Sequence, residues 1–147
     1  PEEIARADIS IGPDGATLPP GSGSVAKGKE VYTEKCQSCH GAQGANGPMD
    51  RLTGGIGSLL TDRPVKTVAS YWPYATTVFD YVRRAMPFPA PQSLTNDEVY
   101  AVVAYILSID TIVPDDAVLT EKNLALIKMP NREGFVSYWP KAPPRAP

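Results

Sequence analysis

The hydrophobic pattern along the chain predicts three amphipathic helices separated by irregular segments. The clearest helix begins at Thr95-Asn96-Asp97-Glu98, a capping box in which the first and last side chains bond each other's backbone N–H groups. It continues to about Ser108. Its apolar positions recur at helical spacing and are Val99, Val102, Val103, Ile106 and Leu107. We expect this helix to pack against the first helix of the chain.

That first helix is predicted from Val25 to about Cys36, with Ser24 as its N-cap. Gly28 lies one turn before Tyr32 on the same face. A glycine there is either merely tolerated, at a cost of up to about 1 kcal/mol, or required for close approach of a second helix. We favour close approach, with Tyr105 of the capped helix packing near Gly28 and Tyr32.

A third helix is predicted from about Thr76 to Ala85, and a short helical candidate runs from Thr120 to Ile127. The third helix has its apolar residues at Val78, Phe79 and Val82. Arg83 and Arg84 follow at its C-terminal end, where the helix dipole favours positive charge.

The remaining segments have no sustained helical or strand period, in keeping with 16 prolines and 12 glycines. Residues 1–23 are either a disordered leader or an arm bound to the surface, and their scattered apolar residues favour the arm. Residues 24–109 are predicted to form the main domain. Residues 110–147 are predicted to form an extension that packs on its own domain or on a partner.

Charge and hydropathy exclude several classes of partner. A net charge of −2 and a pI near 5.4 argue against nucleic acid and against an anionic membrane surface. The longest apolar run, from Val99 to Leu107, is too short to span a bilayer. The chain lacks a positively charged start followed by an apolar segment, so we expect any signal peptide to have been removed or left out.

The chemistry is concentrated at Cys36-Gln37-Ser38-Cys39-His40, which holds both cysteines and the single histidine. Two cysteines two residues apart, with histidine directly after the second, are typical of covalent attachment of one haem c. Both thiols then form thioethers, and the imidazole becomes the proximal iron ligand. A zinc site would need about four ligands, and the chain has no further Cys or His to complete one. A thioredoxin-like dithiol would need a βαβ context, which is absent here.

The second axial ligand must come from elsewhere in the chain, because no second histidine exists. Met86 lies between two predicted helices in the proline-stiffened segment Met86-Pro87-Phe88-Pro89. We predict that Met86 is the sixth ligand; Met129 or an open position is the alternative. Histidine–methionine ligation raises the reduction potential and leaves no vacant position on the iron, which favours electron transfer.

Further haem contacts are predicted from loops and aromatic residues. We expect the Pro48 carbonyl to accept a hydrogen bond from the ring N–H of His40 that does not face the iron, since a backbone carbonyl normally orients a ligating histidine. Side chains in and after the second glycine-rich loop, Gly54-Gly55-Ile56-Gly57, are expected to line the pocket. Polar groups of the aromatic cluster Tyr71-Trp72-Pro73-Tyr74 or of the arginine pair are expected to bind a propionate. The residues predicted for these two roles are Ile56, Leu59, Leu60, Tyr71, Trp72 and Arg84.

The order of these features over residues 25–109 resembles the all-α class I cytochrome c fold, in which the N- and C-terminal helices cross beside one covalent haem. A closer resemblance, to the SoxD-type cytochromes, extends over nearly the whole chain. It rests on Pro13-Asp14-Gly15, Leu18-Pro19-Pro20-Gly21-Ser22-Gly23, Ser70-Tyr71-Trp72-Pro73-Tyr74-Ala75-Thr76-Thr77, Arg83-Arg84-Ala85-Met86-Pro87-Phe88 and Lys128-Met129-Pro130-Asn131.

This resemblance implies an electron-transfer protein of the periplasm, in line with haem attachment outside the bacterial cytoplasm. It implies that electrons arrive from the molybdopterin-containing catalytic subunit of a sulfite dehydrogenase and leave to a downstream cytochrome c or oxidase. One alternative is a free-standing shuttle to a terminal oxidase or photosynthetic centre. Another is a haem enzyme or ligand sensor in which Met86 is displaced.

Overall fold

The computed structural model describes residues 1–138, apart from the side chains of residues 5 and 6. The proline-rich end of the predicted extension, residues 139–147, lies outside the described residues. The helices are α1 (Glu2–Ala7), α2 (Val25–Lys35), α3 (Gln37–His40), α4 (Val68–Tyr71), α5 (Ala75–Ala85) and α6 (Asn96–Ile109). Two short strands, β1 (Ser22–Ser24) and β2 (Val118–Thr120), and three 3₁₀ turns, η1 (Ala42–Gly44), η2 (Ser58–Leu60) and η3 (Leu124–Leu126), complete the fold.

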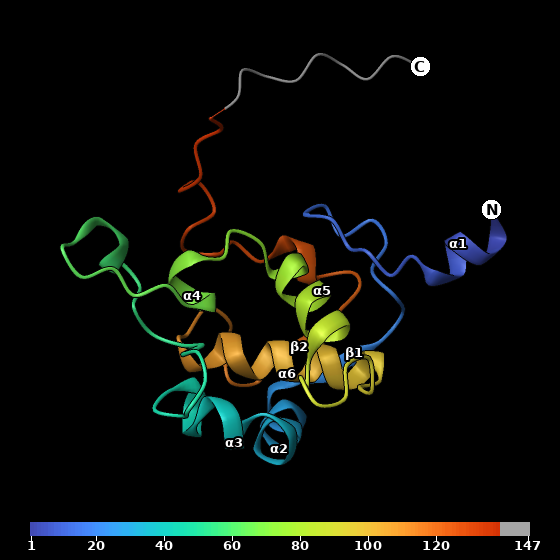
Figure 1. The fold of residues 1–147 in the computed structure, drawn as a ribbon, viewed down its shortest axis with the longest axis horizontal. Coiled ribbons are helices and arrows are strands. Elements are labelled where there is room, and N and C mark those ends of the chain that lie inside the picture. The colour runs from blue at the N-terminus through green and yellow to red at the C-terminus, as the bar shows by residue number, and fades with distance from the viewer. Residues whose placement is uncertain (139–147) are drawn as a thin grey trace.

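Helix α6 forms the centre of the core, and the predicted capping box starts it. Glu98 N–H donates to Thr95 Oγ1 at 3.2 Å, and Thr95 N–H donates to Glu98 Oε2 at 2.8 Å. Every residue from Val99 to Ser108 is buried. Figure 1 shows α2 and α3 on one side of α6 and α5 on the other. The predicted helix is therefore confirmed within one residue of its end.

The crossing of α2 and α6 depends on Gly28. A Cβ atom at Gly28 would overlap the backbone carbonyl of Ala101 and would lie 2.8 Å from the Cβ of Tyr105. Beside this contact, the rings of Tyr32 and Tyr105 lie 5.2 Å apart between centroids. Close approach of the two helices at Gly28, with Tyr32 and Tyr105 alongside, is confirmed.

Residues 1–23 are bound to the domain and are more regular than the sequence predicted. They contain α1 and end in β1, which pairs antiparallel with β2 so that Gly23 lies opposite Leu119. The Ile11 side chain is buried in the core. The predicted arm on the surface is therefore confirmed, but α1 and β1 were not expected in it. Strand β1 is formed by pairing with a strand almost a hundred residues later, which no local pattern records.

The helix expected from Thr120 to Ile127 is also wrong, since this segment forms the end of β2, a turn and η3. Asn123 stabilises the turn with its side-chain amide. Its Oδ1 accepts from Thr120 N–H at 2.8 Å, and its Nδ2 donates to the Val118 carbonyl at 2.9 Å. Asparagine offers the backbone these local bonds as an alternative to the helix.

The following part of the extension packs on its own domain up to Phe135. Met129 is 1% exposed and belongs to the core. Asn131 Nδ2 donates to the carbonyl of Tyr71 at 2.8 Å, and the Phe135 ring stacks edge-on against the Tyr71 ring. Arg132 lies over the ring of Tyr74, 4.3 Å from its centroid. These contacts hold Tyr71 and Tyr74, at the end of α4 and the start of α5, against the extension.

Two buried tyrosines are expected to make stability fall at alkaline pH. Burial raises the pKa of Tyr32 and of Tyr100 to about 12, from an ordinary value of 10.0. The folded state therefore holds these protons more tightly than the unfolded state, and stability that is complete below pH 10 is lost as the pH rises through 12. One pKa unit corresponds to about 1.4 kcal/mol.

Circular dichroism of urea unfolding at several alkaline pH values measures this loss. Tyr32→Phe or Tyr100→Phe should flatten the dependence above pH 10, whereas Tyr81→Phe, at an exposed position, should leave it unchanged. An equally steep loss in all three variants would contradict the assignment.

Candidate haem site

The Cys36–His40 segment consists of Cys36, where α2 ends, and the single turn of α3. Cys36 N–H still bonds the Tyr32 carbonyl at 2.9 Å, but the φ of −124° at Cys36 ends α2 and redirects the chain. Within α3, His40 N–H donates to the Cys36 carbonyl at 3.0 Å. The two cysteines form no disulfide with each other, and both are half-buried. The turn thus holds two thiols and an imidazole within five residues.

His40 is oriented by a backbone carbonyl, although not by the predicted one. Its Nδ1 lies 2.7 Å from the carbonyl oxygen of Asp50, whereas Pro48 is exposed. The Pro48 prediction was wrong, because the carbonyl beside the ring belongs to Asp50, two residues further along the loop, and Met49 N–H between them bonds the Cys39 carbonyl at 2.9 Å. A carbonyl can only accept, so Nδ1 carries the proton and Nε2 keeps a free lone pair for iron.

The loop after His40 is fixed by close backbone packing. Gly41 has a φ of +80°, and a Cβ there would overlap the carbonyl of Ala45. The Tyr32 hydroxyl donates to the Gly41 carbonyl at 2.9 Å, which joins the loop to α2. This packing holds the Asp50 carbonyl against His40.

The three methionines differ in their availability as a ligand. Met49 is 59% exposed on the loop beside the attachment turn, and Met129 is 1% exposed within the core. Met86 is half-buried at the C-cap of α5, and its N–H donates to the Val82 carbonyl at 3.1 Å. Of the three, Met86 combines a fixed backbone with a partly accessible side chain, so its assignment as the distal ligand remains our proposal.

The structure places the other predicted contacts in different surroundings. Ile56 is 49% exposed, Leu59 is half-buried, and Leu60 is 98% exposed at the end of η2. Trp72 is half-buried and packs edge-on against Tyr81, and Lys66 lies over the ring of Tyr71. These residues stay predictions as haem contacts. Arg84 bonds Asp80 and Ser10, so its guanidinium is already engaged and its contact with a propionate is the weakest of these predictions.

Sequence reasoning missed the residues that tie the second glycine-rich loop to α6. The Asp110 carboxylate accepts from Gly54 N–H at 2.8 Å, and Thr67 Oγ1 donates to the Gly54 carbonyl at 2.6 Å. Thr67 and Ser70 also form the capping box of α4, a pattern that the sequence does contain. Asp110 had no comparable local signal.

The electrostatics of the cysteines fit haem attachment better than dithiol chemistry. Burial raises the pKa of the Cys36 thiol to about 11, and the neighbouring Cys39 adds to the effect. A redox dithiol needs a thiolate of lowered pKa, so Cys36 lacks the property that such chemistry requires. Among residues 1–138, no group of three or more His, Cys, Asp and Glu side chains is placed to hold a bare metal ion.

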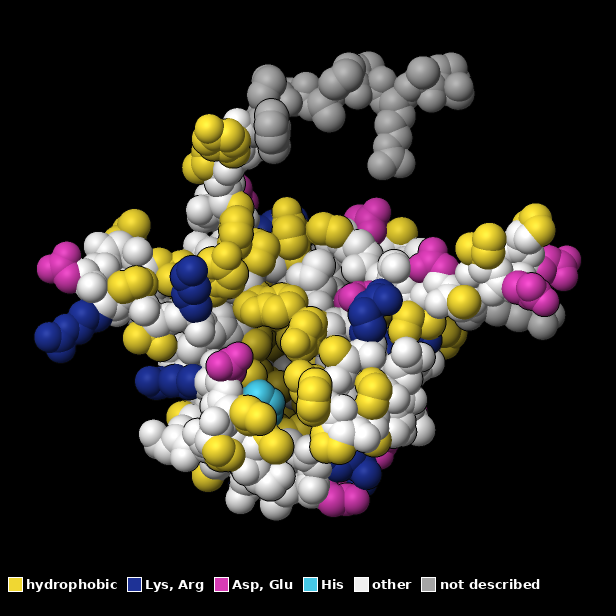
Figure 2. All heavy atoms as spheres, viewed as in Figure 1, with side chains coloured by type: hydrophobic (Ala, Val, Ile, Leu, Met, Phe, Trp, Pro, Cys, Tyr) yellow, Lys and Arg dark blue, Asp and Glu magenta, His cyan; other side chains and the backbone are white. Residues whose placement is uncertain are grey.

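The residues present fit a haem. Figure 2 shows the histidine among hydrophobic side chains, with the surface hollowed beside it. The thiols of Cys36 and Cys39 are of the kind that attaches a haem covalently, and the Nε2 of His40 and the half-buried thioether of Met86 are suitable donors to its iron. Within residues 1–138, the helices are too short or too polar to cross a membrane.

Comparison with known proteins identifies the family of the chain. The family model described as Cytochrome c matches residues 25–110. The chain is 47% identical to a chain in the crystal structure of the sulfane dehydrogenase SoxCD from Paracoccus pantotrophus, with a TM-score of 0.88. The match covers 92% of this chain and 68% of that chain. Comparison with curated proteins gives no match. The chain belongs to the cytochrome c family, the electron-transfer proteins that bind haem c covalently.

Proposed function

We propose that this cytochrome accepts single electrons from a periplasmic molybdenum dehydrogenase that oxidises a reduced sulfur compound, and passes them to another cytochrome or an oxidase. The observation that carries the proposal is the likeness to a sulfane dehydrogenase chain at 47% identity over 92% of this chain. Because the match covers 92% of this chain, it includes parts of the arm and of the extension outside residues 25–110. A simple shuttle has no need of these added segments.

Four residues of the chain are proposed to hold the haem, each in a different way. Cys36 and Cys39 attach it covalently, and His40 presents Nε2 in an orientation fixed by the Asp50 carbonyl. Met86 would supply the second protein ligand to the iron and so exclude water and other small ligands. The haem, when bound, supplies an iron that gains and loses one electron. An iron without a free coordination position suits electron transfer better than ligand binding or catalysis.

The surface near the attachment turn suits docking by apolar and polar contacts. Gln37 and Ser38 are exposed and uncharged, and Phe88, in the segment after Met86, is 79% exposed. Asp50 and Arg51, also exposed, carry opposite charges on adjacent residues. We therefore expect a docking face without a ring of lysines.

The rate of haem reduction by the catalytic partner should depend only weakly on salt. Stopped-flow rates should change less than about threefold between roughly 0.01 M and 0.15 M salt, over which the Debye length falls from about 30 Å to about 8 Å. Electrostatically steered association would instead lose about tenfold or more. A steep fall in rate would contradict the uncharged docking face.

Purification from the native periplasm separates a dehydrogenase subunit from a free shuttle. If the cytochrome serves a dedicated dehydrogenase, haem and molybdenum should elute together under mild conditions and in a constant ratio. A cytochrome that elutes as a free monomer, with all the molybdenum in other fractions, would favour the shuttle.

A further inference from the structure

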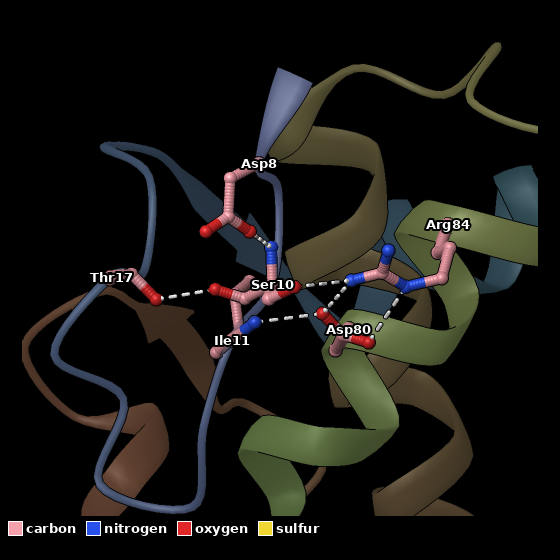
Figure 3. A network of polar contacts seen from close by, with 6 residues as sticks. All are labelled: Asp8, Ser10, Ile11, Thr17, Asp80 and Arg84. Atoms are coloured by element: carbon pink, nitrogen blue, oxygen red, sulfur yellow. Dashed lines mark hydrogen bonds and ion pairs between the residues drawn. The ribbon is translucent and has the colours of Figure 1, made fainter. Parts of the chain in front are cut away.

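Residues 8–17 are bonded to α5 through a network centred on Asp80 (Figure 3). Asp80 Oδ1 accepts from the N–H of Ile11 at 2.8 Å. The Arg84 guanidinium donates to both oxygens of Asp80, from Nη2 at 2.8 Å and from Nε at 3.1 Å, and Nη2 also reaches Ser10 Oγ at 3.3 Å. The arm is held in turn by Thr17, whose hydroxyl donates to the Ser10 carbonyl at 2.7 Å.

The Arg84 side chain is 43% exposed, as in an ordinary surface ion pair, but Asp80 and Ile11 are more buried. Ile11 is 5% exposed, and the side chain of Asp80 is 21% exposed. Burial alone would raise the pKa of Asp80, but the hydrogen bonds from Arg84 and Ile11 outweigh it and hold the pKa below its usual value. The carboxylate is therefore ionised at neutral pH, and hydrogen bonds to an ionised group are about twice as strong as neutral ones.

The network lies on the part of α5 that leads directly to Met86. Asp80 and Arg84 are four residues apart on the last turns of the helix, and Met86 follows as its C-cap. At the other end of α5, Thr76 Oγ1 donates to the Pro13 carbonyl at 3.0 Å. The same arm thus contacts α5 near its beginning and near its end, which fixes the helix along its length.

We infer that Asp80 and Arg84, held against residues 10–11 of the arm, are positioning residues that keep Met86 directed toward the haem iron. The inference rests on the proposed ligation of iron by Met86. The arm then has a role in the electron-transfer site itself. When its hydrogen bonds to α5 are weakened, the fraction of molecules in which Met86 has left the iron rises.

Imidazole binding to the ferric haem protein measures this fraction, since imidazole enters only where Met86 has left, and its apparent affinity scales with that population. Asp80→Ala removes the acceptor of Ile11 N–H and the partner of Arg84. We expect imidazole to bind about tenfold more tightly, in line with the loss of hydrogen bonds to a charged group.

Asp97→Ala is the matched control. Asp97 Oδ1 accepts from the N–H of Ser22 at 2.8 Å, the same kind of bond from the arm, but it lies on α6. The control should change imidazole affinity less than twofold. An equal change in both variants would show general loosening and overturn the inference. Arg84→Lys keeps the charge without the two-pronged contact, and should give an intermediate gain in affinity; it decides the matter if Asp80→Ala does not fold.

The wild-type spectrum separates failure of this inference from failure of the proposed ligation. If the oxidised wild type has no methionine–iron charge-transfer band, Met86 is not the ligand, and both proposals fall. If the band is present and Asp80→Ala and Arg84→Lys bind imidazole no more tightly than Asp97→Ala, only the positioning role falls.

Discussion

Replacement of Met86 by alanine is expected to open the sixth coordination position of the haem. The oxidised variant should lose the methionine–iron charge-transfer band, and the reduced variant should bind carbon monoxide readily. Loss of the thioether, which stabilises ferrous iron, should lower the reduction potential on the order of 0.1 V, a part of the roughly 0.8 V range that axial ligands span. Absorption spectra and a spectroelectrochemical titration measure both effects.

Met49→Ala is the control for this experiment, because Met49 is 59% exposed on the loop beside the attachment turn. It should leave the charge-transfer band and the potential as in the wild type. Retention of the band in Met86→Ala, with its loss in Met49→Ala or Met129→Ala, would transfer the role of ligand to the other methionine.

The second large effect is expected at the crossing of α2 and α6. Gly28→Ala places a Cβ against the backbone carbonyl of Ala101, which cannot rotate away as a side chain would. Alanine would otherwise favour the helix by up to about 1 kcal/mol, so only the overlap can make the variant less stable. We expect a net loss of about 2 to 4 kcal/mol in the free energy of unfolding, near the upper end for overpacked cores.

Urea unfolding of the haem-loaded protein measures this loss. Lys29→Ala, at an exposed position of the same helix, should change stability by less than about 0.5 kcal/mol. Trimming Ala101 to glycine should not rescue Gly28→Ala, because the overlapping atom belongs to the backbone. A Gly28→Ala variant as stable as Lys29→Ala would show that the helices can separate without cost.

The helices of the core were predictable because their signals are local. The capping box at Thr95 fixed the start of α6, and the position of Gly28 before Tyr32 indicated the helix crossing. Strand β1 escaped prediction because it exists only through its pairing with β2. The helix expected from Thr120 to Ile127 does not form, and the Asn123 side chain bonds the backbone of the turn that replaces it.

The site shows the same division between local and distant information. Cys36, Cys39 and His40 follow one another closely, so their chemistry could be predicted from spacing alone. The carbonyl that orients His40 belongs to Asp50 and depends on how the loop folds back, which side-chain identity does not reveal. The contact of Asp80 with Ile11 joins residues 69 positions apart and had no signal in the sequence.

Reduction of the ferric protein by a molybdenum dehydrogenase tests the proposed function most directly. The haem-loaded cytochrome is mixed with the catalytic subunit of a sulfur-compound dehydrogenase, and its absorption spectrum is followed after addition of sulfite or a sulfane-sulfur donor. We expect full reduction of the haem when substrate and catalytic subunit are both present, and slow or no reduction when either is omitted. A cytochrome that stays ferric with every such subunit and substrate, yet is reduced readily by a general electron carrier, would contradict it.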